Sequence, residues 1–219
     1  MAGEQCFLRI GDDCPDFVAE TQNGSIQWHE FIKGSWAVLC SHPKDFTPVC
    51  TTELGVLAQM SGKFAERNCK IAVVSVDTAE SHRNWLKDVD EISNTKVEYP
   101  VIADDTRTVS RLFGMLDQTN LEKPGLPLTV RSVFVISPAK KIELIITYPA
   151  SCGRNFDEIL RVLDSLQLTA YQKVATPANW TAGSKCVVVP SIKTDDAKDI
   201  FPKGVDEVRP YLRFTPDPR

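Results

Sequence analysis

The sequence lacks a C-x-x-C pair, a long apolar run and an excess of basic residues. Its seven cysteines are an odd number and stand singly, which argues against a disulfide framework and against a cysteine-rich zinc site. No stretch approaches the ~18 apolar residues of a membrane-spanning helix. The formal net charge is −4, whereas nucleic-acid binding favours a basic surface. We therefore predict no metal, no nucleic-acid partner and no integral membrane segment.

The N-terminus also lacks the features of a secretory signal. Residues 1–15 contain no basic cluster followed by an apolar run, so we place the protein in the cytoplasm. In a reducing compartment most cysteines serve as small buried apolar residues. The informative question is whether one of the seven cysteines differs from the others.

Apolar runs alternate with helical patterns along the first three quarters of the chain. The pattern predicts strands at 36–40, 70–76, 99–103, 131–137 and 142–148, the last two as a hairpin, and helices from 47, at 79–89, at 106–113 and at 155–166. This order favours an α/β sandwich around a mixed sheet, and a thioredoxin-like fold suits it best.

Composition changes near Val174. The segment from Pro177 onward holds six of the fourteen prolines and one convincing strand, at 186–189. We expect this segment to bury little by itself and to be either a docked subdomain or a partner-facing arm. The predicted division is 5–173 for the main domain and 174–219 for a small C-terminal subdomain.

Cys50 stands where a helix is predicted to begin. Thr47 is a suitable N-cap and Pro48 suits the first helical position, so Cys50 falls in the first turn, where backbone N–H groups lack helical partners. A cysteine thiolate is the nucleophilic form, and a helix N-terminus with a nearby cation favours it. By itself, however, Cys50 could also be one more buried small residue.

The residues around Cys50 carry a family resemblance. His42–Glu53 reads HPKDFTPVCTTE and contains P-x-x-x-T-x-x-C, the active-site signature of the peroxiredoxins. Longer matches are YPA at 148–150, GRNFDEILRV at 153–162, VATP at 174–177 and FPKGV at 201–205. These stretches resemble the peroxiredoxin 6 type, a one-cysteine class with a thioredoxin-like core and a C-terminal dimerisation segment. The resemblance covers nearly the whole chain.

The resemblance implies roles at the centre of the site. Cys50 would attack a peroxide and become a sulfenic acid. Thr47 would orient the peroxide and hydrogen-bond the sulfur, although it could act only as an N-cap. Arg131 would stabilise the thiolate and the charge on the departing oxygen; without the motif, a surface ion pair would be the plain interpretation.

Four further residues would surround this centre. Pro43 would form a wall of the pocket, where the alternative is an ordinary loop proline. His42 would line the pocket near the sulfur. Glu53 would orient an arginine or act in a capping box, and Arg154 matches a second family arginine.

The resemblance also defines the reaction cycle. Two-cysteine peroxiredoxins carry a resolving cysteine in a Val-Cys-Pro context, whereas this chain has Cys186 in CVVVP. An external thiol, glutathione, thioredoxin or another, would therefore reduce the sulfenic acid, with no cofactor. The expected substrates are hydrogen peroxide and organic hydroperoxides, phospholipid hydroperoxides among the candidates, and the expected assembly is a homodimer. A redox-sensing or chaperone-like protein on the same fold is the alternative from another class.

Two positions depart from the family pattern. Some members have a phospholipase activity ascribed to a serine, a histidine and an aspartate; here Ser35 and His29 remain, but Ala139 stands where the aspartate belongs, which argues against a lipase triad. Cys152 replaces a hydroxyl residue in a loop that the family places near the active site. A Cys50–Cys152 disulfide is conceivable, but we expect a free thiol.

Overall fold

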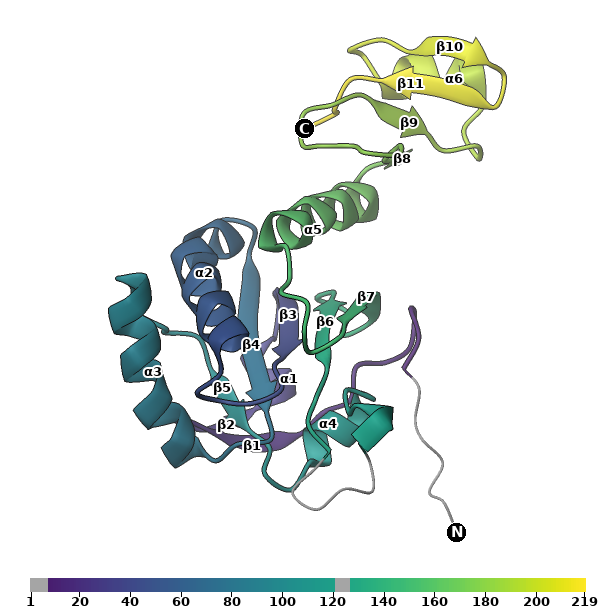
Figure 1. The fold of residues 1–219 in the computed structure, drawn as a ribbon. Helices are drawn as coiled ribbons and strands as arrows, with labels where there is room; N and C mark the ends of the chain where they lie inside the picture. The colour runs from purple at the N-terminus through teal and green to yellow at the C-terminus, as the bar shows by residue number, and fades with distance from the viewer. Residues whose placement is uncertain (1–7, 121–126) are drawn as a thin grey trace. The chain divides into compact units, whose positions relative to one another are not determined.

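The computed structural model describes residues 8–120 and 127–219 (Figure 1). The chain divides into two compact units. The first ends at Phe156, and the second runs from Asp157 to Arg219. Each unit has its own sheet.

The first unit is built on a seven-stranded mixed sheet with the order β2-β1-β5-β4-β3-β6-β7. Its strands are β1 (Val18–Thr21), β2 (Gly24–Gln27), β3 (Trp36–Ser41), β4 (Cys69–Ser75), β5 (Val101–Ala103), β6 (Arg131–Ile136) and β7 (Ile142–Tyr148). The central strands β3, β4 and β5 are parallel, whereas β6 is antiparallel to both β3 and β7. The mixed sheet that the sequence predicts is confirmed.

Burial on both faces explains the unbroken apolar runs of the central strands. Every residue of β3 and β6 is buried, as expected for strands that are covered on both sides. On one face Ala37 and Leu39 pack in a core with Trp28 of α1 (Trp28–Phe31) and Val109 of α4 (Thr108–Leu112). Because side chains alternate along a strand, Val38 and Cys40 point to the opposite face.

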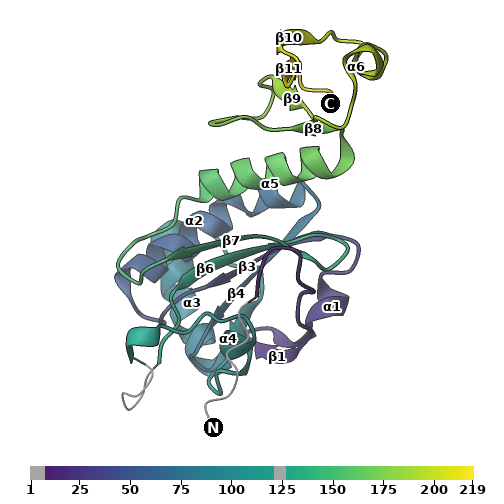
Figure 2. The same cartoon turned by 90° about the vertical axis from the view of Figure 1, so that its right-hand side faces the viewer.

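Helices α2 (Pro48–Ala65) and α3 (Ala79–Ser93) pack side by side, and they contact β4 and β5 respectively (Figures 1 and 2). The indole of Trp85 in α3 donates to the hydroxyl of Thr51 in α2 at 3.1 Å. This contact lies one turn beyond the start of α2, and it ties the first turns of α2 to the neighbouring helix.

Most predicted elements are confirmed, and their ends differ for local reasons. Helix α3 continues to Ser93 and ends where Asn94 adopts φ 48°, a conformation that asparagine tolerates well. Strand β5 begins only after Pro100, because proline cannot donate to a ladder. The β1–β2 hairpin and α1 were absent from the prediction, since each is only four residues long.

The second unit corrects the prediction for the end of the chain. It contains most of α5 (Phe156–Tyr171), and then β8 (Val174–Ala175), β9 (Cys186–Val188), α6 (Thr194–Ile200), β10 (Asp206–Arg209) and β11 (Leu212–Thr215). The four strands form one sheet in the order β10-β11-β9-β8. Trp180, Ile192 and Phe201 are buried in a core of this unit. The expectation that this segment holds one strand and buries little was therefore wrong.

Candidate active site

Cys50 lies in the first turn of α2. Thr47 has the extended backbone of an N-cap, and Pro48 is the first helical residue, as predicted. The amide of Thr51 donates to the carbonyl of Thr47 at 3.0 Å, so the amides before it precede the helical ladder. The Cys50 side chain is fully buried. The sequence pattern therefore places this thiol at the positive end of a helix of 18 residues.

Arg131 brings a positive charge to the sulfur. It is the first residue of β6 and is 3 % exposed. Its Nη1 atom donates to Cys50 Sγ at 3.3 Å and to Glu53 Oε2 at 2.7 Å. Its Nε and Nη2 atoms both donate to the Ala150 carbonyl, at 2.8 and 2.6 Å. The predicted proximity of Arg131 to the thiol is thus present, and three anchors fix the guanidinium in one orientation.

Glu53 binds both arginines of the site from one helical turn beyond Cys50. Arg154 donates to Oε1 through its backbone amide at 2.7 Å and through Nε at 3.0 Å, and its Nη2 donates to Oε2 at 2.7 Å. Burial alone raises the pKa of Glu53, but the hydrogen bonds and charge of Arg154 and the charge of Arg131 outweigh it and hold that pKa below its usual value. Glu53 therefore orients two arginines, as one of its two predicted roles requires.

Arg154 supports the site through the backbone of two central strands. Its Nη1 atom donates to the carbonyls of Ser41 at 2.9 Å and of Ser132 at 3.1 Å, and its guanidinium lies 5.6 Å from the ring centre of Phe156. Its hydrogen bonds go to Glu53 and to these carbonyls rather than to the sulfur. Arg154 thus positions Glu53 against Arg131, and it does so from a buried place in the loop between β7 and α5.

Thr47 differs from the expected arrangement in the contact of its hydroxyl. The Oγ1 atom donates to the Lys44 carbonyl at 2.9 Å, and the side chain makes no capping bond. Thr47 is therefore the N-cap by backbone conformation, and its hydroxyl is oriented by the preceding loop rather than by the sulfur. Its role toward a peroxide stays a prediction. Pro43, in the same loop, is buried, and its role as a pocket wall also stays a prediction.

His42 is fully buried, and its Nε2 atom lies 3.0 Å from Asp45 Oδ1. Asp45 also accepts from His82, which stands in α3. Neither Asp45 nor His82 was predicted from the sequence as a residue of the site. Asp45 lies inside the signature stretch at a position where the signature accepts any residue, and His82 is remote in sequence. The one sequence signal for this contact is the spacing of Asp45 three residues after His42.

The same residues offer a test for metal binding. Ligand atoms of His42, Asp45 and Asp77 lie within 4.8 Å of one another. Asp45 already accepts from two imidazoles and from the hydroxyl of Ser81. Asp77 Oδ2 accepts from the amide of Asp45 and from the hydroxyl of Ser75. Hydrogen bonds from neighbouring protein groups therefore account for the arrangement of both carboxylates without a cation.

Known proteins resemble this chain over nearly its whole length. Residues 10–145 match the model of the AhpC/TSA family, and residues 165–204 match the C-terminal domain of 1-Cys peroxiredoxin. The chain is 50 % identical over 212 residues to a 1-Cys peroxiredoxin of Dictyostelium discoideum, covering 97 % of this chain and 86 % of the relative. This chain belongs to the peroxiredoxin family.

Solved peroxiredoxin structures agree along the whole chain. A cysteine-to-serine mutant of the Peroxiredoxin 6 of Arenicola marina gives a TM-score of 0.90 at 46 % identity, covering 97 % of this chain and 99 % of that one. A yeast mitochondrial 1-Cys peroxiredoxin, whose thiol resolving mechanism proceeds via glutathione and thioredoxin systems, gives 0.89 at 46 %, covering 96 % and 100 %. The thioredoxin-like fold is confirmed, and so is thiol-dependent peroxidase function of the one-cysteine type.

The other described cysteines of this peroxiredoxin differ from Cys50. Burial raises the pKa of Cys14 and of Cys40 to about 11, and that of Cys69 to about 12. These three thiols therefore stay protonated at neutral pH. Cys152 is exposed and free, while Cys6 lies outside the described residues. Among the cysteines that the structure describes, only Cys50 accepts a hydrogen bond from an arginine.

The lipase residues of the one-cysteine class do not form a triad in this peroxiredoxin. Ser35 is buried. The Nε2 atom of His29 lies 2.9 Å from the carbonyl of Cys14, and its Nδ1 atom lies 3.7 Å from Asp16 Oδ2. Both ring nitrogens of His29 thus face groups other than the serine hydroxyl, whereas a triad needs one of them on the nucleophile. Together with Ala139, this geometry argues against lipase chemistry.

Proposed function

We propose that this chain reduces hydrogen peroxide and organic hydroperoxides with Cys50 as the attacking thiolate. The observation that carries this proposal is the 3.3 Å contact between Arg131 Nη1 and Cys50 Sγ at the start of α2. A cation and a helix N-terminus both favour thiolate over thiol. Both Cys50 and Arg131 are buried, so solvent screens the contact between them only weakly.

The first chemical step oxidises sulfur by two electrons. A lone pair of the Cys50 thiolate forms a bond to the terminal peroxide oxygen, and the O–O bond breaks. The departing oxygen takes its electron pair and a proton and leaves as water or an alcohol. Cys50 becomes a sulfenic acid. Negative charge moves from sulfur toward the departing oxygen, and the Arg131 guanidinium is placed to stabilise it at both ends of the step.

Glu53 and Arg154 serve this step by holding Arg131 still. Arg131 shares Glu53 Oε2 with Arg154, so the carboxylate offsets part of the charge of two buried cations. The Ala150 carbonyl fixes the other edge of the Arg131 guanidinium. Such a pre-oriented donor need not reorganise during the reaction. Thr47 and Pro43 then orient the peroxide and exclude water, and His42 lines the pocket.

Regeneration of Cys50 requires an external thiol. The first thiol condenses with the sulfenic acid, releasing water and leaving a mixed disulfide. A second thiol then attacks this disulfide, releases Cys50 as a thiolate and leaves as an oxidised pair. The yeast relative with glutathione and thioredoxin systems supports these two reductants as candidates. Within residues 8–120 and 127–219, all cysteines are free thiols.

Steady-state turnover tests this cycle directly. Peroxide is supplied in excess with either glutathione or a thioredoxin system, and peroxide consumption is followed over time. We expect many equivalents to be consumed with at least one donor, and we expect Cys152→Ser to behave like the parent. Consumption of a single equivalent with every donor would contradict regeneration by an external thiol. It would instead favour the redox-sensor interpretation of the same fold.

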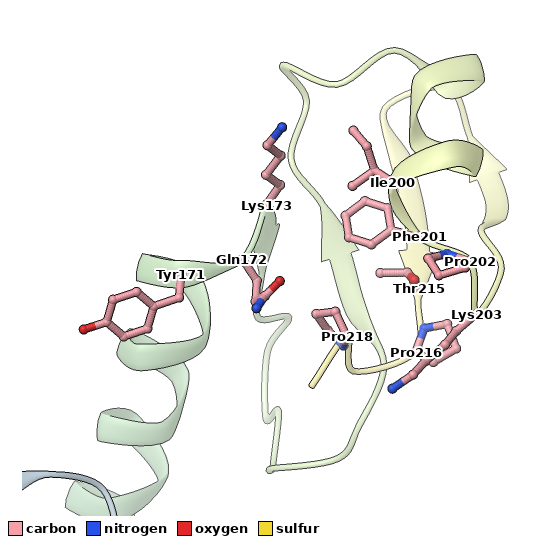
Figure 3. A pocket seen from close by; sticks show the side chains of 10 residues that line it. All are labelled: Tyr171, Gln172, Lys173, Ile200, Phe201, Pro202, Lys203, Thr215, Pro216 and Pro218. Atoms are coloured by element: carbon pink, nitrogen blue, oxygen red, sulfur yellow. The ribbon is translucent and has the colours of Figure 1, made fainter.

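We also propose that the chain forms a homodimer through its C-terminal unit. Large apolar side chains on this unit face solvent, namely those of Tyr171, Ile200, Val208 and Tyr211. Two of them, Tyr171 and Ile200, line a hollow of about 280 Å³ together with Phe201 and three prolines, Pro202, Pro216 and Pro218 (Figure 3). Exposed apolar surface of this kind marks an interaction site.

The cytoplasm remains the proposed compartment. The support is the set of free cysteines among the described residues, which suits a reducing environment. The structure also contains no described helix that is long and apolar enough to cross a membrane. Fractionation of the cells that express the protein, with detection of the native chain, tests this proposal.

A further inference from the structure

The imidazole of His42 is buried with one nitrogen that has no partner. Its Nε2 atom lies 3.0 Å from Asp45 Oδ1, and its ring packs 5.1 Å from Trp85. Nδ1 is one of only three buried side-chain polar atoms without a hydrogen bond in the described part of the chain. Burial lowers the pKa of His42, against the opposing effect of Asp45. A neutral ring with an unused nitrogen requires an explanation.

The carboxylate of Asp45 decides which nitrogen carries the proton. It accepts from His82 Nδ1 at 2.8 Å and from Ser81 Oγ at 2.7 Å, in addition to His42. Burial alone raises the pKa of Asp45, but the hydrogen bonds of the two histidines outweigh it and hold that pKa well below its usual range. An ionised carboxylate only accepts hydrogen bonds. The proton of His42 therefore sits on Nε2, and Nδ1 keeps its lone pair.

His82 completes the hydrogen-bond network of this cluster. Its Nδ1 atom faces the Asp45 carboxylate, and its Nε2 atom lies 3.2 Å from the carbonyl of Ile102. Each ring nitrogen of His82 therefore faces an oxygen atom. His82 contacts Oδ2 of the Asp45 carboxylate, while His42 contacts Oδ1. The remaining acidic group beside them, Asp77, is bound to the amide of Asp45 and to Ser75.

The same contacts hold the loop before Cys50 in a strained conformation. Phe46 has φ 54° and is 58 % exposed, and this left-handed region is rarely adopted by a bulky side chain. Such strain persists where the surroundings enforce it. Asp45, its direct neighbour, is fixed through both its amide and its carboxylate. This anchoring connects α3 to the segment that carries Pro43 and Thr47.

We propose that Asp45 is a positioning residue of the peroxidase site, held in place by His82. It keeps His42 as the neutral Nε2–H tautomer, so that Nδ1 accepts but does not donate a hydrogen bond. The ligand that suits such a nitrogen carries an O–H group, as a hydroperoxide does. This role rests on the proposed function of Cys50, but its structural part, the tautomer, is measurable without any turnover.

Nitrogen NMR of the full-length protein labelled at its histidines tests the tautomer. The sequence holds only three histidines, so single substitutions assign the signals. At neutral pH we expect His42 to be neutral with its proton on Nε2. A His42 proton on Nδ1, or a cationic His42, would overturn the proposal. Because the parent protein itself is measured, the His42 tautomer is determined even if a variant at Asp45 does not fold.

The variant Asp45→Asn tests the consequence for the reaction. Asparagine has one acceptor oxygen where aspartate has two, so it cannot accept from His42 on one oxygen and from His82 on the other. We therefore expect altered His42 signals and a peroxide rate lowered by about a hundredfold, the scale of an acid–base contribution. Asp88→Asn, an exposed carboxylate on α3, is the matched control. A folded Asp45→Asn protein with parental signals and rate would refute the role. Cys50→Ser, in contrast, abolishes turnover without moving the His42 tautomer, which separates this proposal from the proposed function.

Discussion

Arg131 donates to the sulfur of Cys50 at 3.3 Å across 81 positions of sequence. The two residues meet because β6 lies beside β3 in the sheet, and β3 leads into the loop before α2. This juxtaposition joins the helix N-terminus, which is a local feature, to a charge that only the tertiary fold can supply.

Replacing Arg131 tests the role of this charge. We expect Arg131→Met to lower the thiolate fraction of Cys50 and to slow its oxidation by on the order of a hundredfold, the effect of losing one pre-oriented donor. Ultraviolet absorbance of the thiolate and stopped-flow kinetics measure the two effects. Arg83→Met, at an exposed position of α3, is the control. Parental absorbance and kinetics in the Arg131 variant would show that the contact has no chemical role.

Glu53 should couple stability to pH. Its pKa is depressed in the folded state, so its contribution to the free energy of unfolding is present above the unfolded pKa and is lost as pH falls through the folded pKa. We therefore expect the parent to lose stability as the pH drops below about 4, the range in which a free glutamate titrates. Chemical denaturation at a series of pH values measures this loss.

Glu53→Gln isolates that contribution. The variant leaves two buried guanidinium groups without their carboxylate, which costs about 3–5 kcal/mol. Its stability should also change less with pH over the same acidic range. Glu80→Gln, at an exposed position of α3, is the matched control. The account of Glu53 fails if the Gln variant is as stable at neutral pH as the parent.

The local part of the site could be predicted from sequence, and the long-range part could not. Thr47, Pro48 and Cys50 lie within one helix start, so capping preferences place them together. Arg131 and Arg154 were found through the family resemblance, because no local rule joins them to Glu53. Asp45 was missed for the same reason, since its partner His82 stands on another helix.

The C-terminal unit shows the same limit in the fold. Strand β10 has the sequence DEVR, and all four residues are exposed. It therefore lacks the alternation of apolar and polar residues by which a strand is predicted from sequence. Strand β8 has only two residues. The core of this unit joins residues from Leu168 to Phe201, and none of its short segments reveals that core alone.

Cys152 should remain a free thiol during oxidation of Cys50. The residue is exposed, in a loop that the Arg131 contacts to the Ala150 carbonyl hold in place. A disulfide requires Cα atoms within about 7 Å and suitably directed side chains, whereas Cys152 Sγ contacts the carbonyl of Gly153 at 3.8 Å. Mass mapping after one equivalent of peroxide should show sulfenic or sulfinic Cys50. A Cys50–Cys152 linked peptide would overturn this prediction.

The proposed dimer can be tested at its exposed apolar side chains. We expect the parent to sediment at twice the mass of one chain, and we expect the double variant Tyr171→Glu and Ile200→Glu to sediment as a monomer, because buried charges oppose association. Ile92→Glu, at an exposed position of α3, should leave the assembly unchanged. If the double variant and the parent have the same mass, the hollow in Figure 3 is not the interface.

Cys50 alone should carry the reaction with peroxide. A single-turnover stopped-flow experiment compares the reduced parent, Cys50→Ser and Cys152→Ser, each mixed with a small excess of hydrogen peroxide and without a thiol donor. We predict a rapid loss of one equivalent of peroxide per chain for the parent and for Cys152→Ser, and no rapid loss for Cys50→Ser. A rapid phase of similar amplitude in Cys50→Ser would contradict this prediction.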